Sequence, residues 1–198
     1  QLSADAVLGC DASGAIRMRR QQELLAEVPS AFFSPEEAAE LLARGDRSVL
    51  ALSYGWLTRA HPDPHGTTLA AVRRHLREHP DAIHCGLFWD FASLPQKGED
   101  GTDRTAAEKE AFGRGLDCMA VCYASITGTA VLVYKDIVIP DGATSDYNRT
   151  PYDGKGGRGW CIFEQGVSMT AAATLSAAVR EATALPERFA RAQASRPK

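Results

Sequence analysis

Glu164, near the carboxyl end of the chain, stands in a setting typical of a reactive carboxylate. A glycine-rich segment, 153–157, precedes it, and an apolar run surrounds it. Trp160, Phe163 and Val167 recur at helical spacing, which predicts a helix with one buried face. The carboxylate then lies at the edge of that face, within the first turns, where the helix dipole favours its ionised form. Two interpretations stay open: Glu164 caps amides at the helix start, or the glycine loop carries an ionised carboxylate to the rim of a pocket.

Other residues that could bind a ligand follow the apolar runs of the chain. Asp90 could be a second carboxylate, although we favour the interpretation that it caps a neighbouring amide. Tyr54, Trp56 or Phe91 could stack on a flat ring, while packing in the core or at a rim is the commoner use of such rings. Arg59 could bind a phosphate through two parallel hydrogen bonds, and a solvated arginine is the alternative.

Two groups of residues have spacings that raise the question of a metal site. His61, Asp63 and His65 could bind a metal, but the two prolines between them favour a rigid loop. Cys118 and Cys122 lie one helical turn apart without a second pair of ligands nearby, so we interpret them as packing residues. The sequence therefore predicts no metal centre.

Three short apolar runs predict the buried strands that would position these residues. They cover residues 48–54, 83–90 and 129–134, and the last could extend through residue 139. Asp90 falls at the end of the second run. The long segment 140–157 is rich in Pro, Gly, Asp and Asn, and a loop of that length in a compact domain is usually functional or disordered.

Amphipathic stretches alternate with the strands. Ser34, Pro35 and Glu37 form a helix start with a capping box, and Gly45 is a natural stop. A second helix opens at residue 67 or 68. Its expected inner residues are Leu69, Val72 and Leu76, and its expected solvent-facing residues are Arg73, Arg74 and Arg77.

A third helix carries a long apolar stripe and ends shortly before the last strand. The stripe consists of Phe112, Leu116, Met119 and Tyr123. Gly113 and Gly115 each weaken this helix by about 1 kcal/mol relative to alanine, so we expect one of them to permit close packing.

The alternation of strands and helices predicts an α/β fold with a parallel sheet in the order 2-1-3, covered by helices on both faces. Loops after all three strands then meet at one edge, where such folds bind ligands. That edge and the start of the last helix would collect the candidate ligand-binding residues Ser53, Tyr54, Trp56, Arg59, Asp90, Phe91 and Trp160 beside Glu164. Such a crevice suits a ligand with flat rings, sugars and phosphates.

The ends of the chain are expected to be additions to this domain. We divide the chain into an accessory segment, 1–33, and an α/β domain, 34–198, whose last residues from 171 read as a helical tail. The accessory segment suggests a small hairpin from 7 to 18 and a short helix from 21 to 28. Since the sequence begins at Gln1 rather than at Met, we expect a fragment, from which targeting signals could be missing.

Composition limits the classes of partner. A net charge of −3 without dense basic clusters gives no footprint for nucleic acid. No apolar run has the length of a membrane span, and no signal peptide is visible. The odd number of cysteines, five, mostly within apolar segments, predicts unpaired thiols in a reducing, cytoplasmic compartment.

Three motifs, in order, resemble those of heterokaryon-incompatibility (HET) domains. Residues 51–56 resemble their A-L-S-Y-x-W, residues 87–96 their hydrophobic-W-I-D…C-I-N-Q, and residues 158–164 their R-x-W-x-x-Q-E. This family is related to the Toll/interleukin-1 receptor (TIR) domains, whose W-C-x-x-E is similar to residues 160–164. The resemblance covers about residues 48–170. Residues 93–96 depart from the C-I-N-Q pattern, and the usual fourth and fifth strands are not evident after residue 170.

The resemblance implies a flavodoxin-like, three-layer fold and, for part of the TIR family, cleavage of NAD at the nicotinamide–ribose bond. The essential glutamate of W-C-x-x-E carries over to Glu164. NAD would then be a substrate and not a cofactor, and the lack of a glycine-rich dinucleotide fingerprint argues against its redox use. The alternative is a non-catalytic signalling or assembly module that self-associates or binds partner proteins, because fold alone does not settle function.

Overall fold

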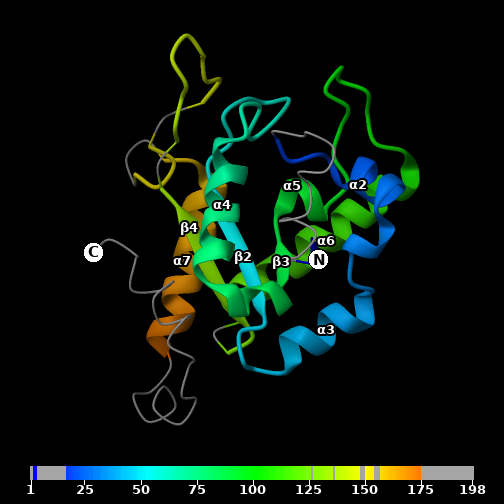
Figure 1. The fold of residues 1–198 in the computed structure, drawn as a ribbon, viewed down its shortest axis with the longest axis vertical. Helices are drawn as coiled ribbons and strands as arrows, with labels where there is room; N and C mark the ends of the chain where they lie inside the picture. The colour runs from blue at the N-terminus through cyan, green and yellow to red at the C-terminus, as the bar shows by residue number, and fades with distance from the viewer. Residues whose placement is uncertain are drawn as a thin grey trace.

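The structure is a computed structural model that describes residues 2–3, 17–125, 127–135, 137–147, 150–153 and 157–174. Its centre is a sheet in the order β1-β3-β2-β4. Strand β2 (Val49–Tyr54) lies between β3 (Gly86–Phe88) and β4 (Thr129–Tyr134) and pairs in parallel with both, as Figure 1 shows. The predicted order 2-1-3 is confirmed. A two-residue strand, β1 (Leu2–Ser3), adds an antiparallel partner to β3.

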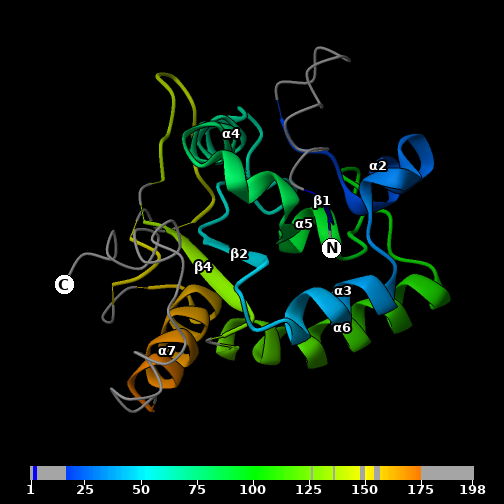
Figure 2. The ribbon, with the colours of Figure 1, turned by 60° about the horizontal axis from the view of Figure 1, so that its bottom comes forward.

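Helices cover both faces of this sheet. Figure 2 shows α4 (Thr67–Glu78) on one side and α3 (Pro35–Ala43), α6 (Ala106–Ala124) and α7 (Gly159–Thr174) on the other. The short elements are α2 (Gln21–Glu27), α5 (Asp90–Ser93) and the 3₁₀ turns Pro29–Ala31 and Pro80–His84. The α/β architecture in three layers that the sequence predicts is therefore present.

Alternation along β2 explains why the molecule has two core clusters. Successive side chains of a strand point to opposite faces of the sheet, so a strand between two helical layers must be apolar throughout. Leu50 and Leu52 pack in the cluster that holds Leu69, Val72 and Leu76 of α4. Val49 and Ala51 pack in the cluster that holds Met119 and Tyr123 of α6.

The predicted helix starts are confirmed in atomic detail. At α3, the Ser34 hydroxyl accepts from the Glu37 amide at 3.2 Å, and the Glu37 carboxylate accepts from the Ser34 amide at 2.8 Å. Gly45, with a φ of 67°, follows the helix end. Helix α6 begins with a second capping box, between Thr105 and Glu108, which sequence analysis missed.

The prediction for the second strand was too long. The chain from Pro80 to His84 forms a 3₁₀ turn, and only Gly86–Phe88 pair with β2. Asp90 starts α5 instead of ending the strand, because the Trp89 amide donates to the Ser93 hydroxyl and the Leu94 amide to the Asp90 carbonyl. Strand β4 confirms the predicted bounds 129–134. The extension through residue 139 that the sequence left open is not present, since β4 stops opposite the last residue of its partner β2.

The prediction for Arg73 was wrong. Its side chain is 7% exposed instead of facing solvent, while Arg74 and Arg77 are exposed. Position 73 lies one helical turn after the buried Leu69, which places it on the inner face of α4.

The two glycines of α6 pack as expected, with one of them permitting a close contact. A Cβ at Gly115 would overlap the Leu94 side chain, whereas nothing lies within 4 Å of a Cβ at Gly113.

The described part of segment 1–33 packs into the main core. Helix α2 confirms the predicted short helix, and Met18, Leu24 and Ala31 join the cluster under α4. Residues 7–16 of the expected hairpin and the expected tail after residue 174 lie outside the described residues. In the described part of the chain, Cys118, Cys122 and Cys161 are free thiols. No described helix is both long and apolar enough to cross a membrane.

Candidate functional site

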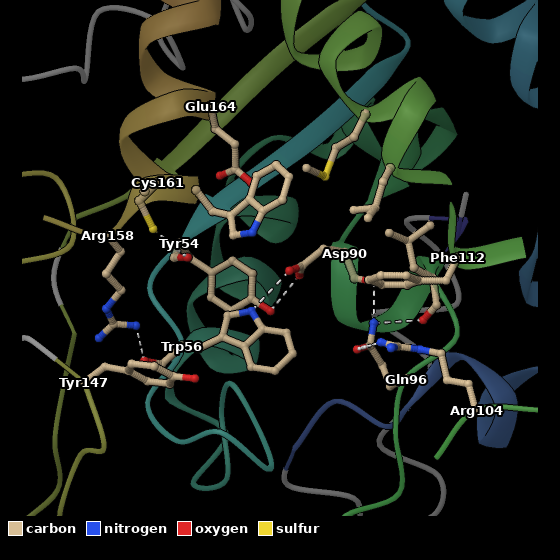
Figure 3. Close-up of a pocket in the computed structure, with 15 residues that line it drawn as sticks. Tyr54, Trp56, Asp90, Gln96, Arg104, Phe112, Tyr147, Arg158, Cys161 and Glu164 are labelled. Atoms are coloured by element: carbon tan, nitrogen blue, oxygen red, sulfur yellow. Dashed lines mark hydrogen bonds between the residues drawn. The ribbon is translucent and has the colours of Figure 1, made fainter. Parts of the chain in front are cut away.

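A cavity of about 390 Å³ opens at the carboxyl edge of the sheet. The loops after β2 and β3, helix α6 and the start of α7 surround it. Figure 3 shows its lining, which consists of Tyr54, Trp56, Asp90, Leu94, Gln96, Arg104, Phe112, Leu116, Met119, Tyr147, Arg158, Gly159, Trp160, Cys161 and Glu164. Its volume falls within the range usual for small-molecule sites, at the lower end.

Glu164 forms the inner wall of this cavity and is only 7% exposed. The Ser53 hydroxyl, at the end of β2, donates to Glu164 Oε2 at 2.6 Å, and lies 2.9 Å from the Tyr152 hydroxyl. Burial raises the pKa of Glu164 to about 8; the hydrogen bond from Ser53 lowers it and the nearby Asp90 charge raises it further. Glu164 thus lies at a cavity, as one of the two interpretations expected, but burial opposes the ionised form that the helix start was expected to favour.

Helix α7 turns a different face inward from the one its apolar residues predict. Trp160 is 56% and Phe163 41% exposed, whereas Cys161, Glu164 and Ser168 are buried. Small and polar side chains let the helix approach the sheet closely, and the Cys161 thiol donates to the Tyr54 carbonyl at 3.3 Å. The predicted buried face, with Trp160 and Phe163, is therefore corrected.

Asp90 lies across the cavity from this helix and receives three hydrogen bonds. The Tyr54 hydroxyl at 2.9 Å and the Phe91 amide at 2.6 Å donate to Oδ1, and Trp56 Nε1 donates to Oδ2 at 3.1 Å. Burial raises the pKa of Asp90, and these hydrogen bonds oppose the rise. Asp90 thus caps the Phe91 amide, the interpretation that the sequence favoured, and also lines the cavity.

Two arginines that sequence analysis did not select line the cavity. The Arg158 guanidinium donates to the Trp56 carbonyl and lies 4.6 Å from the centre of the Tyr147 ring. Arg104 Nε donates to the Pro95 carbonyl at 2.6 Å, and its guanidinium lies 3.7 Å from the centre of the Phe112 ring. Burial lowers the pKa of both arginines.

The structure brings most of the predicted residues together but separates two from the cavity. Tyr54, Trp56, Asp90, Trp160 and Glu164 line it, and Ser53 lies directly behind Glu164.

Phe91 and Arg59, the two other predicted residues, do not line the cavity. Phe91 is buried, with its ring edge-on to Trp56 at 5.7 Å and to His61 at 4.6 Å between centroids. Arg59 is exposed outside the cavity lining, and its backbone amide donates to Asp146.

The loop that follows Arg59 is held by its own polar side chains. His61 Nε2 lies 2.8 Å from the Met18 carbonyl, and His61 Nδ1 accepts from the Asp63 amide at 2.9 Å. The Asp63 carboxylate accepts from the Leu69 amide and the Thr67 hydroxyl at the start of α4. These bonds fit the rigid loop that the two prolines predict. Among the described residues, no cluster of three or more His, Cys, Asp or Glu is placed to hold a metal ion.

The residues missed by sequence analysis come from α6 and the long loops. Gln96 and Arg104 belong to the loop after α5, and Tyr147 to the loop before α7. Their proximity depends on how these loops fold back, which no periodicity reports. Arg158 had a usable signal, since it is the first residue of the R-x-W motif.

Comparison of the chain with known proteins gives no match: no protein-family model, no curated protein and no solved structure is similar to it.

Proposed function

We propose that this protein is a TIR/HET-like nucleotide N-glycosidase that cleaves the nicotinamide–ribose bond of NAD, with Glu164 as the key carboxylate. The observation that carries the proposal is the meeting of Glu164, Asp90 and aromatic side chains in one cavity at the carboxyl edge of a parallel sheet. The three motifs that resemble HET and TIR domains support it.

The reaction is a hydrolysis at the anomeric carbon. The bond between ribose C1′ and the pyridinium nitrogen breaks, and both electrons stay on the nitrogen, so that nicotinamide leaves as a neutral molecule. The sugar passes through an oxocarbenium-like state, and the oxygen of a water molecule bonds to C1′ with release of one proton. Because the leaving group needs no protonation, a carboxylate that faces the sugar cation is the main catalytic requirement.

Glu164 can meet this requirement although it is protonated in much of the free protein near neutral pH. A positive charge that enters or develops beside a buried carboxyl favours its ionised form, so substrate binding and bond cleavage both lower its pKa. We assign to Glu164 the stabilisation of the ribosyl cation and the binding of ribose hydroxyls. With a pKa of about 8 in the free protein, kcat/KM should rise with pH and level off above about 8.

The test is release of nicotinamide from NAD by the purified protein at high concentration, with Glu164→Gln and Glu110→Gln compared. The first variant keeps the shape of the side chain but loses its charge, and should lower turnover about a hundredfold or more. Glu110, exposed on α6 and paired with Arg114, offers the same substitution away from the site and should leave turnover unchanged. Equal turnover in wild type and a folded Glu164→Gln protein would falsify the catalytic role.

A specific observation favours a second candidate function, that of an assembly module. Trp160, Ile162, Phe163 and Met169 of α7 are exposed. Glu164 is the one charged residue between Gly159 and Thr174, and it points inward. An uncharged apolar helix face is typical of a protein–protein contact.

In either role we expect a reducing, cytoplasmic compartment, as the free thiols suggest.

A further inference from the structure

Arg158, Asp90 and Arg104 of the cavity lining are joined by one series of hydrogen bonds, to which Glu164 does not belong. Arg158 donates to the Trp56 carbonyl, and Trp56 Nε1 donates to the Asp90 carboxylate. On the other side, Gln96 Nε2 donates to the Asp90 carbonyl at 3.2 Å, and Arg104 Nη2 donates to Gln96 Oε1 at 3.3 Å. Figure 3 shows the result: the Asp90 carboxylate lies between the two guanidinium groups. The cavity thus has a carboxylate at its centre and a cation toward each end.

The Arg104 end keeps hydrogen-bonding capacity for a ligand. A guanidinium has five N–H donors. Its hydrogen bonds within the described residues go to the Pro95 carbonyl and to Gln96 Oε1, and its nearest ring is that of Phe112. The charges of Asp103 and Glu108 act on Arg104 from a distance, but no ion pair joins Arg104 to a carboxylate of the described residues, so an anionic oxygen could bond to it directly. Phosphate oxygens suit the planar fork of an arginine.

Aromatic rings accompany the carboxylate at the centre. The Tyr54 hydroxyl and the Trp56 indole hold both oxygens of Asp90, and both side chains line the cavity. A carboxylate that accepts several hydrogen bonds keeps its charge more readily than one that accepts few, and the Asp90 carboxylate accepts three. These hydrogen bonds oppose the burial that raises the pKa of Asp90, and a cation that binds beside the carboxylate favours its charged form further. A carboxylate beside indole and phenol rings then attracts a flat cation through its charge and through the ring quadrupole together.

From this arrangement we propose that the cavity selects nucleotides whose base is itself a cation: Asp90 and Trp56 bind a pyridinium ring, and Arg104 binds the phosphate. The inference rests on the proposed function, since it places the ring beside Asp90 and leaves Glu164 for the ribose. It adds roles for Asp90 and Arg104 in selecting the substrate by binding, which the NAD-cleaving chemistry alone does not require. The reduced ring has nearly the same size but no charge, so it loses the attraction to Asp90.

Binding without cleavage tests this selection. The probes are carbocyclic nicotinamide mononucleotide, whose ribose ring oxygen is replaced by carbon so that it resists hydrolysis, and its reduced form. Isothermal titration calorimetry with the wild-type protein should give at least about a tenfold lower Kd for the oxidised probe. Asp90→Asn should bring the two Kd values together. Arg104→Gln should raise the Kd values of both probes by a similar factor, because both probes carry the phosphate.

Three results would overturn the proposal: no measurable binding of either probe, similar wild-type Kd values for both, or an undiminished preference in folded Asp90→Asn protein. If Asp90→Asn does not fold, the same two Kd values are measured with Glu164→Gln. Asp90 is then the remaining carboxylate of the cavity lining, so a preference for the oxidised probe that persists in this variant is assigned to Asp90. A preference that disappears in Glu164→Gln contradicts the proposal. The outcome is independent of turnover, so selective binding without nicotinamide release would refute the enzyme activity alone.

Discussion

Glu164 should make the stability of the protein depend on pH in an unusual direction. Its ordinary pKa is 4.5, and in the folded protein burial raises it to about 8. Between these two values the folded state binds more protons than the unfolded state, so the free energy of unfolding must fall as the pH rises. A tenfold change in proton affinity corresponds to about 1.4 kcal/mol, which makes the total effect on the order of a few kcal/mol.

The variant Glu164→Gln isolates this effect, because glutamine cannot ionise. Thermal melts of wild type and variant from pH 5 to pH 9 should show the two stabilities converging at low pH, with the variant the more stable protein above about pH 8. The exposed Glu110→Gln serves as the control and should follow the wild-type curve. A variant curve parallel to that of the wild type would mean that Glu164 titrates in its ordinary range.

The sequence indicated which residues form the site more readily than it indicated their pKa values. Tyr54 ends β2, Trp56 follows it, and Asp90 follows β3, so the rule that ligands bind at the carboxyl edge selects them. The raised pKa of Glu164 could not be predicted in this way, because it depends on the desolvation that packing of α7 against β2 imposes. Arg104 reaches the cavity through a loop whose path has no periodic signal.

At the scale of elements, the two glycines of α6 provide a matched pair. Gly113→Ala should stabilise the helix by about 1 kcal/mol, since nothing occupies the space of the new methyl group. Gly115→Ala gains the same propensity but drives the methyl group into Leu94, which must shift toward the cavity that it lines. Overpacking of this kind typically costs about 1 to 3 kcal/mol. Denaturant titration should therefore rank Gly113→Ala above wild type and Gly115→Ala below it. If the two variants are equally stable, α6 and Leu94 do not pack closely.

Helix starts were the elements best predicted from sequence, because a cap is local. Ser34 and Glu37 bond to each other's amides across three residues, and the pattern needs no information from elsewhere in the chain. The orientation of α7 is not local. Its large apolar side chains predict the inward face, yet the contact with the sheet requires the smaller Cys161 and Ser168.

At the scale of the whole molecule, the sheet order follows from connectivity. A strand–helix–strand unit crosses over right-handedly, and three such strands with helices on both faces leave few arrangements. The extent of each strand is set instead by its partner: β3 pairs over three residues of β2, although the apolar run is much longer. The packing of Met18 and Leu24 under α4 had no signal, because a contact between distant segments leaves no pattern in either.

The outer face of α7 leads to a prediction about the assembly of the molecule. Phe163 and Met169 are exposed, and neither lines the cavity. A face without charges can meet a second copy of itself without repulsion, and burial of such side chains contributes about 25 cal/mol per Å². We expect wild-type protein to self-associate as its concentration rises, and the double variant Phe163→Glu, Met169→Glu to stay monomeric.

Sedimentation velocity over a hundredfold range of concentration measures this, with Leu25→Glu as the matched control. Leu25 is comparably exposed but belongs to α2, at the far side of the molecule from α7 in Figures 1 and 2. The control should associate as the wild type does, because the new charge lies away from the proposed contact. Nicotinamide release by the double variant then separates the two candidate functions. Activity that falls with association would show that assembly supports catalysis, and unchanged activity would show that the cavity works in a single copy. A wild-type protein that remains monomeric throughout would remove the support that α7 gives to the assembly module.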